Sequence, residues 1–490
     1  MFEAAELGQS ISKRQYDVAA PKLRTALLEA HFALSKTKIP VIVIVSGADG
    51  AGKGEVVHRL NEWLDPRGVE THSFWQVYEE ERERPPYWRF WRVLPPRGRI
   101  GVLFGSWYTA PIIDRVYGKI KNGRLDSELD RIAFFEKMLA DDGALIVKFW
   151  FHIAKKAQKQ MLTKLEADPR TRSRVIAADW KHYKLYDKFT RISERAIRRT
   201  DAGHAPWHII EAADRRFREL TAGRILLKSI TERLRAAPVS KSAPVEPPPM
   251  ERGGKNILDR VDLGQKLSER DYRDQVAEAQ GRLTELTWAA SRKKVSVVAL
   301  FEGWDAAGKG SAIRRVTAAV DPRLYHIVSV AAPTDEERAH HYFWRFWRHL
   351  PRAGRMLIFD RSWYGRVLVE RVEGFARPDE WKRAYLEIND FEEQLATYGI
   401  VVAKFWIHIS KEEQLRRFRE RETTPYKRHK ITAEDWRNRK RWGAYKDAVN
   451  DMVAHTSTGN APWTLVAGND KKFARVQILK TLCASLEAAL

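Results

Sequence analysis

The sequence predicts two tandem α/β domains, each built on a parallel sheet with helices on both faces. Three observations support this: the chain repeats itself at a fixed offset, each copy alternates short apolar runs with helical stretches, and each copy places a glycine-rich loop between such a run and a helix. The chain has 490 residues, of which 44% are apolar and 31% charged. That composition excludes a disordered chain and allows more than one packed core.

The internal repeat has an offset of 256 residues. GADGAGKG begins at Gly47 and GWDAAGKG at Gly303, and WRFWR begins at Trp88 and again at Trp344. Five further pairs of short motifs align at the same offset without a gap. A repeat this long means two whole domains, which we place at 1–235 and 256–490, joined by a proline-rich linker at 236–255.

In the second copy, the order of elements predicts a doubly wound sheet. A charged helical stretch ends at Arg292, and an apolar β-branched run with the length of a strand follows it. Further strand candidates alternate with helical stretches and have nearly continuous apolar character, as parallel strands covered on both faces do. The five strand candidates are Val295–Phe301, His326–Val330, Met356–Asp360, Ile400–Phe405 and Thr464–Val466.

The loop GWDAAGKG fits most of a phosphate-binding P-loop. Gly303 and Gly308 stand five residues apart and Lys309 follows, so backbone N–H groups, from Ala307 onward, could surround a phosphate while the lysine reaches it. The usual hydroxyl after the lysine is replaced by Gly310, and Ser311 comes one place late. Asp305, inside the loop, is therefore the candidate metal ligand. A plain glycine-rich turn is the alternative.

An apolar strand candidate ends in Asp360 and Arg361. Doubly wound sheets present functional groups at the carboxyl ends of their strands. Asp360 could hold magnesium beside the loop and Arg361 could neutralise a bound phosphate, whereas a surface ion pair is the alternative.

A run of arginines at helical spacing predicts a helical lid over the phosphate site. A solvated basic helix face is the other interpretation. Two more arginines, among the aromatic residues of HYFWRFWRHLP, could add phosphate contacts, while those aromatics are expected in the core. The four arginines of the lid and the two others are Arg416, Arg417, Arg419, Arg421, Arg345 and Arg348.

The two copies differ at these chemical positions. Phe104 and Gly105 stand where the second copy has Asp360 and Arg361, the lid arginines have no counterparts, and Glu55 replaces Ser311. Phosphoryl transfer depends on positioning and on charge stabilisation. We therefore expect one working site, in the C-terminal copy.

Charge and cysteine content indicate which class of partner and which cellular compartment to expect. The 87 lysines and arginines against 64 acids give a formal charge of +23, which favours a polyanionic partner. Cys483 is the only cysteine, the apolar runs are short, and the N-terminus shows no signal peptide. We expect a cytoplasmic protein with no membrane partner. No nucleic-acid motif is present, so we expect no nucleic-acid partner.

GWDAAGKGS, WRFWRHLP, IFDRSWYGRVL, KFWIHISKEEQLRRFRER, EDWRNRKRW and APWTLV, in that order, resemble the polyphosphate kinase 2 family. Fused domains with a degenerate first copy resemble its two-domain class, the polyphosphate:AMP phosphotransferases. The resemblance implies tandem P-loop kinase-like domains and transfer of a terminal phosphate from inorganic polyphosphate to AMP, giving ADP.

The resemblance also assigns roles to residues. It implies magnesium, or manganese, at Asp305 and Asp360, catalysis by these acids with Lys309, Arg361 and Arg421, and nucleotide binding by Arg361, Arg366 and Arg421. Two other donors or acceptors stay open: a nucleoside diphosphate as acceptor (ADP to ATP or GDP to GTP), or ATP as donor. We expect a homo-oligomer, for which paired domains suggest a dimer.

Overall fold

A computed structural model describes residues 1–74, 76–236 and 256–490. The chain divides into two compact units, which we describe in turn: Met1–Val77, Arg89–Ser240 and Thr334–His341 form the first, and Tyr78–Trp88, Lys241–Pro333 and Tyr342–Leu490 the second. The predicted linker at 236–255 lies outside the described residues except for Ala236, so its bounds stay a prediction. No helix of the described residues is both long and apolar enough to cross a bilayer.

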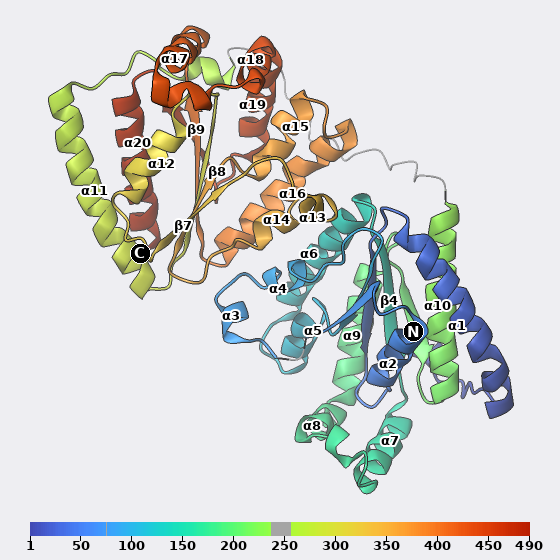
Figure 1. Cartoon of the computed structure of the whole chain (residues 1–490). Helices are drawn as coiled ribbons and strands as arrows, with labels where there is room; N and C mark the ends of the chain where they lie inside the picture. Colours follow the sequence, from blue (N-terminus) through green and yellow to red (C-terminus); the bar gives the residue numbers. More distant parts are fainter. Residues whose placement is uncertain (75, 237–255) are drawn as a thin grey trace. The chain divides into compact units, whose positions relative to one another are not determined.

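The second unit contains a parallel five-stranded sheet in the order β10-β9-β6-β8-β7, seen in the upper part of Figure 1. The prediction of an α/β fold with a parallel sheet is confirmed: the strand Met356–Asp360 has the predicted ends, and the ends of the other four strands differ by one to three residues. The strands are β6 Val297–Gly303, β7 Tyr325–Ser329, β8 Met356–Asp360, β9 Val401–His408 and β10 Trp463–Ala467.

Helices cover both faces of this sheet (Figure 1). α11, α12 and α20 pack together on one face, and α16 and α19 on the other. The helices of the second copy are α11 Glu269–Arg292, α12 Lys309–Thr317, α13 Asp335–Arg338, α14 Trp344–Trp347, α15 Val369–Val372, α16 Pro378–Thr397, α17 Lys411–Thr423, α18 Ala433–Lys440, α19 Trp442–Thr456 and α20 Lys471–Ala489, with 3-10 turns η3 Ile257–Arg260, η4 Trp363–Arg366 and η5 Pro425–Lys430; of these, α13 falls in the first compact unit.

The first unit repeats this architecture with the strand order β2-β3-β1-β4-β5, again all parallel. Its strands are β1 Val41–Gly47, β2 Val69–Ser73, β3 Ile100–Phe104, β4 Leu145–His152 and β5 Trp207–Glu211. The helices of the first copy are α1 Lys13–Ser35, α2 Lys53–Trp63, α3 Glu79–Arg82, α4 Trp88–Trp91, α5 Thr109–Val116, α6 Asn122–Asp141, α7 Lys155–Ala167, α8 Ala177–Lys184, α9 Tyr186–Thr200 and α10 Arg215–Arg235, with 3-10 turns η1 Phe2–Ala5 and η2 Arg172–Arg174.

A buried polar network fixes the same strand–helix packing in both copies. In the second, the Lys404 ammonium on β9 donates to the Glu392 carboxylate at 2.7 Å and to the Tyr364 hydroxyl at 2.8 Å. In the first, Lys148 donates to Glu136 at 2.7 Å and to the hydroxyl of Tyr108 at 3.0 Å. Buried charges persist only when paired and hydrogen-bonded. Because both copies keep the network, it belongs to the scaffold and not to the chemistry.

The aromatic residues of HYFWRFWRHLP are buried, as predicted. Phe343, Trp344, Phe346 and Trp347 are at most 7% exposed. Phe346 and Trp347 pack edge-on or tilted against neighbouring rings of the same unit. They therefore form core and not a base-stacking platform.

Candidate active site

The glycine-rich loop lies at the switch point of the second sheet. β6 is the central strand, with β8 on one side and β9 on the other, so the loop after it opens between two crossovers. Gly303 is required there because a Cβ would stand 2.6 Å from the Ile407 carbonyl oxygen of β9. Gly308, at φ 116°, turns the chain into α12, which begins at Lys309. Ligands bind at such switch points, and a helix N-terminus favours anions.

The lysine of the loop is held over the loop itself. The Lys309 ammonium donates to the Gly303 and Trp304 carbonyl oxygens at 2.7 and 3.3 Å. Ser311 donates its hydroxyl hydrogen to the Gly308 carbonyl oxygen at 2.9 Å. Both side chains therefore lie at the loop, while Gly310 is exposed on the first turn of α12.

The carboxylate of Asp305, in the loop, contacts both the lid and the residue that follows β8. Its Oδ2 accepts from the Asn438 amide of α18 at 2.9 Å, and its Oδ1 is 3.6 Å from the Arg361 guanidinium. Asn438 was not predicted from the sequence. The signal that could have found it is its counterpart at the 256-residue offset, His182, which pairs with the equivalent loop aspartate.

Asp360 and Arg361 are carried to the loop by strand register. Asp360 ends β8 opposite Phe301 of β6, and the Arg361 backbone N–H donates to the Phe301 carbonyl oxygen at 3.1 Å. Arg361 has a φ of 64°, a left-handed conformation that costs a residue with a Cβ about 1 kcal/mol or more. The first copy has Gly105 there, with a φ of 81°. An arginine in this conformation, where the first copy has a glycine, makes Arg361 a candidate functional residue.

Glu302, the last residue before the loop, is a third acid that sequence reasoning missed. It is 5% exposed and accepts a hydrogen bond from the Ser362 hydroxyl at 2.8 Å. Burial raises the pKa of Glu302, although the Ser362 hydrogen bond and the charges of Lys309 and Arg361 oppose the shift. The first copy has Ser46 at this position, which was the available signal.

The loop tryptophan anchors the loop to the start of α19 and to the end of β9. Trp304 stacks on Trp442, with ring centroids 3.7 Å apart, and its Nε1–H donates to His408 Nδ1 at 3.0 Å. Burial lowers the pKa of His408 to about 4, so the ring is neutral at pH 7 and accepts this hydrogen bond. The stack and the hydrogen bond together hold one side of the loop in place.

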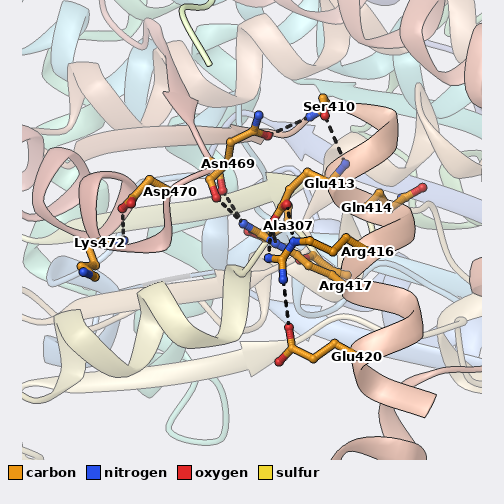
Figure 2. Close-up of polar contacts among 12 residues, drawn as sticks. Ala307, Ser410, Glu413, Gln414, Arg416, Arg417, Glu420, Asn469, Asp470 and Lys472 are labelled. Atoms are coloured by element: carbon orange, nitrogen blue, oxygen red, sulfur yellow. Dashed lines mark hydrogen bonds and ion pairs between the residues drawn. The ribbon is translucent and has the colours of Figure 1, made fainter. Parts of the chain in front are cut away.

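The predicted lid consists of α17, η5 and α18, and two residues of α17 reach the loop. Gln414 donates its amide hydrogen to the Asp305 carbonyl oxygen at 3.2 Å. Arg417, 2% exposed, turns its guanidinium toward backbone carbonyl oxygens (Figure 2). We predicted Arg417 as a phosphate ligand, but its donors are directed at protein acceptors.

Two other lid arginines, Arg416 and Arg421, make contacts within the lid. Arg416 pairs with Glu413 at 2.6 Å and with Glu420 at 3.6 Å. Arg421 donates to the Lys430 carbonyl oxygen at 2.8 Å, which closes η5 onto α17. The structure thus places Arg421 within the lid and joins the lid to the loop through Gln414, Arg417 and Asn438.

Three predicted residues make their contacts elsewhere. Arg345 donates to the Ala331 carbonyl oxygen, just past β7, at 3.1 Å. The Arg348 guanidinium lies over the Trp344 ring, and Arg366 pairs with Glu370 at 3.1 Å. Strand register and hydrogen bonds instead bring together Asp305, Lys309, Asp360 and Arg361.

The loop of the first unit has a different surrounding. Asp49 pairs with His182 at 2.6 Å and lies 3.5 Å from the Lys53 ammonium. Glu55, which stands in place of Ser311, is paired with Arg218 and lies 3.6 Å from Arg174. The two acids at the first loop, Asp49 and Glu55, are therefore already paired with basic side chains of the protein.

Two acids fit what a magnesium site needs. The described residues hold no group of three or more acidic, histidine or cysteine side chains arranged for a metal ion. Magnesium in phosphate-transfer sites uses one or two carboxylates, with water and substrate phosphates completing its shell. Asp305 and Asp360, which both interact electrostatically with Arg361, are the candidate carboxylates for such an ion.

The fold and the site define a P-loop phosphate-binding domain with a helical lid. A family model described as polyphosphate kinase 2 matches residues 10–238 and 266–490. The chain belongs to the polyphosphate kinase 2 family.

Comparison with individual proteins supports the same family. The chain is 54% and 51% identical to proteins named polyphosphate:AMP phosphotransferase from Pseudomonas aeruginosa and Pseudomonas syringae, over 100% of this chain and 99% of each relative. A crystal structure assigned to polyphosphate kinase 2 from Pseudomonas aeruginosa PA01 matches with a TM-score of 0.90 at 52% identity, covering 100% of this chain and 99% of that one.

Proposed function

We propose that this chain is a magnesium-dependent polyphosphate:AMP phosphotransferase whose active site lies in the C-terminal copy. The relatives that share both copies carry that name. The observation that carries the proposal is the grouping of Asp305, Lys309, Asp360 and Arg361 at the switch point of one sheet. The other sheet has Phe104 and Gly105 at the last two of these positions.

The reaction forms one P–O bond and breaks one. A phosphate oxygen of AMP attacks the terminal phosphorus of polyphosphate, and the bridging oxygen leaves on a chain one unit shorter. A nucleotide phosphate oxygen is already anionic, so no general base is needed. Catalysis then rests on positioning and on stabilising charge.

The basic and the acidic residues of the site would have different roles in the reaction. Lys309 and the loop N–H groups would bind the donor end, and Arg361 with Arg421 would hold the AMP phosphate when the lid closes. Asp305 and Asp360 would hold magnesium, or manganese in its place, which screens the negative charge on the phosphate oxygens. Glu302 would orient Ser362 beneath the site.

Two alternatives use the same residues. Relatives that match 44–46% of this chain are named ADP-, GDP- or NDP-polyphosphate phosphotransferases, so a diphosphate acceptor is the main one. ATP as the donor is the other. The cytoplasmic location and a homo-oligomeric state remain predictions.

A substrate screen tests the proposal. The purified protein is incubated with magnesium, either polyphosphate or ATP, and AMP, ADP, GMP or GDP, and products are separated by anion-exchange chromatography. We expect ADP from AMP and polyphosphate as the fastest reaction. Product from AMP with ATP but none with polyphosphate would refute the donor, and faster reaction of ADP or GDP than of AMP would refute the acceptor.

A further inference from the structure

Arg417 makes a buried connection between the lid and the back of the phosphate loop. Its Nη1 donates to the Ala306 and Ala307 carbonyl oxygens at 3.1 and 2.7 Å. Its Nη2 donates to the carbonyl oxygens of Gly468 and Asn469, between β10 and α20, at 2.6 and 3.0 Å. One guanidinium thus joins α17, the loop and the turn before α20.

The surroundings hold this guanidinium in one orientation (Figure 2). Its Nε donates to the Glu413 carboxylate at 2.6 Å, and Glu413 lies in the first turn of α17, where its N–H donates to the Ser410 hydroxyl. The Ser410 N–H in turn donates to the Asn469 side chain at 3.0 Å. Every nitrogen of the Arg417 guanidinium therefore has a protein acceptor, and the planar group has little freedom to turn.

Those contacts fix the direction of one loop amide, that of Gly308, whereas the Ala307 N–H already donates to the Trp304 carbonyl oxygen at 3.0 Å. In a planar trans peptide, the N–H points opposite to the C=O. Because the Ala307 carbonyl points at Arg417, the Gly308 N–H points away from it, toward the inside of the loop. Amide hydrogens directed into a loop are what binds phosphate oxygens in such loops.

The first copy lacks this arrangement. Met161 stands in place of Arg417. The guanidinium in the first copy belongs instead to Arg218, on another helix, α10. Arg218 donates to the Ala212 carbonyl oxygen, the counterpart of Gly468, at 2.8 Å and pairs with Glu55. Arg218 thus holds the turn before α10 and neutralises Glu55. In the second copy, the Arg417 guanidinium donates hydrogen bonds to carbonyl oxygens of the loop.

We propose that Arg417 is a positioning residue that orients the Gly308 amide of the loop for the polyphosphate donor without touching the donor. The proposal rests on the proposed function for the identity of the ligand, and on the hydrogen bonds above for the role. It predicts that changes at Arg417 affect binding of the donor and leave binding of AMP alone.

The test compares Arg417→Lys and Arg417→Met with Arg218→Met, a matched change of a buried arginine in the first copy. Thermal unfolding, KM for each substrate, kcat, and calorimetric binding of tripolyphosphate are measured on the full chain. For Arg417→Lys we expect KM for polyphosphate and Kd for tripolyphosphate to rise about tenfold or more, with KM for AMP within about twofold. Arg417→Met should show the larger loss, and Arg218→Met should lower thermal stability while leaving both constants unchanged.

Three results would overturn the inference: unchanged polyphosphate constants in Arg417→Lys, equal rises in both KM values, or loss of the folded second unit in Arg417→Lys. An inactive wild-type protein would refute the proposed function alone. The tripolyphosphate titration would still test Arg417 in that case, because it requires no turnover.

Discussion

The two copies share a scaffold and differ in chemistry. Both have the same strand order, the same buried lysine–glutamate network and a lysine folded over its loop. Only the second copy has an acid and an arginine, Asp360 and Arg361, at the end of the strand beside the loop. Only the second copy also has a lid arginine, Arg417, that contacts the loop. The same fold therefore forms with and without these groups, so the residues found only in the second copy, together with the loop aspartate and lysine that both copies share, are the candidates for function.

Among the acids and arginines of the site, we expect replacement of the carboxylate at the end of β8 to cause the largest loss of activity. Asp360→Asn keeps the shape but removes the charge that would hold magnesium, so we expect kcat to fall about a thousandfold or more. The half-exposed side chain makes little contribution to packing, so thermal stability should change little. Transfer assays and calorimetry check both statements, and an unchanged rate would remove Asp360 from the site.

Converting Arg361 to the residue of the first copy should separate function from stability. Arg361→Gly removes a charge 3.6 Å from Asp305 and relieves a left-handed backbone conformation. We expect activity to fall about a hundredfold and the free energy of unfolding to rise by up to about 1 kcal/mol. The two changes are measured by transfer assay and by denaturant unfolding. Activity and stability falling together would contradict a strained functional arginine.

We expect a small pH-dependent effect on the stability of the first unit. Hydrogen bonding to Asp49 raises the pKa of His182, so the protonated ring stabilises the first unit. This contribution is present in full below the ordinary histidine pKa of 6.5 and is lost as pH rises through the raised value. His182→Asn, which installs the residue of the second copy, should weaken the fall in stability between slightly acid and alkaline pH. Unfolding curves across that range test it, and an unchanged pH profile would contradict the ion pair.

The fold was largely predictable because its signals are local. Continuous apolar runs place the parallel strands, and the 256-residue offset transfers each element from one copy to the other. The loop residues Asp305 and Lys309 and the pair at the end of β8 were predictable for the same reason. The left-handed backbone of Arg361 was readable too, since its counterpart is Gly105.

The contacts of the lid could not be predicted, because they depend on which face of α17 and α18 turns toward the loop. Arg416 and Arg417 are neighbours in a basic helix, yet one pairs with acids on α17 and the other is buried against carbonyl groups. Asn438 stands in a run of charged residues whose composition predicts only a solvated face. Tertiary packing, and not residue type, assigns these roles.

The most direct test of a single working site is to remove each loop lysine in turn. Polyphosphate-dependent formation of ADP from AMP is measured for Lys309→Ala and Lys53→Ala, with thermal unfolding as the check on folding. We expect that Lys309→Ala removes nearly all turnover and that Lys53→Ala keeps it close to the wild-type rate. Comparable losses from the two variants would contradict this expectation.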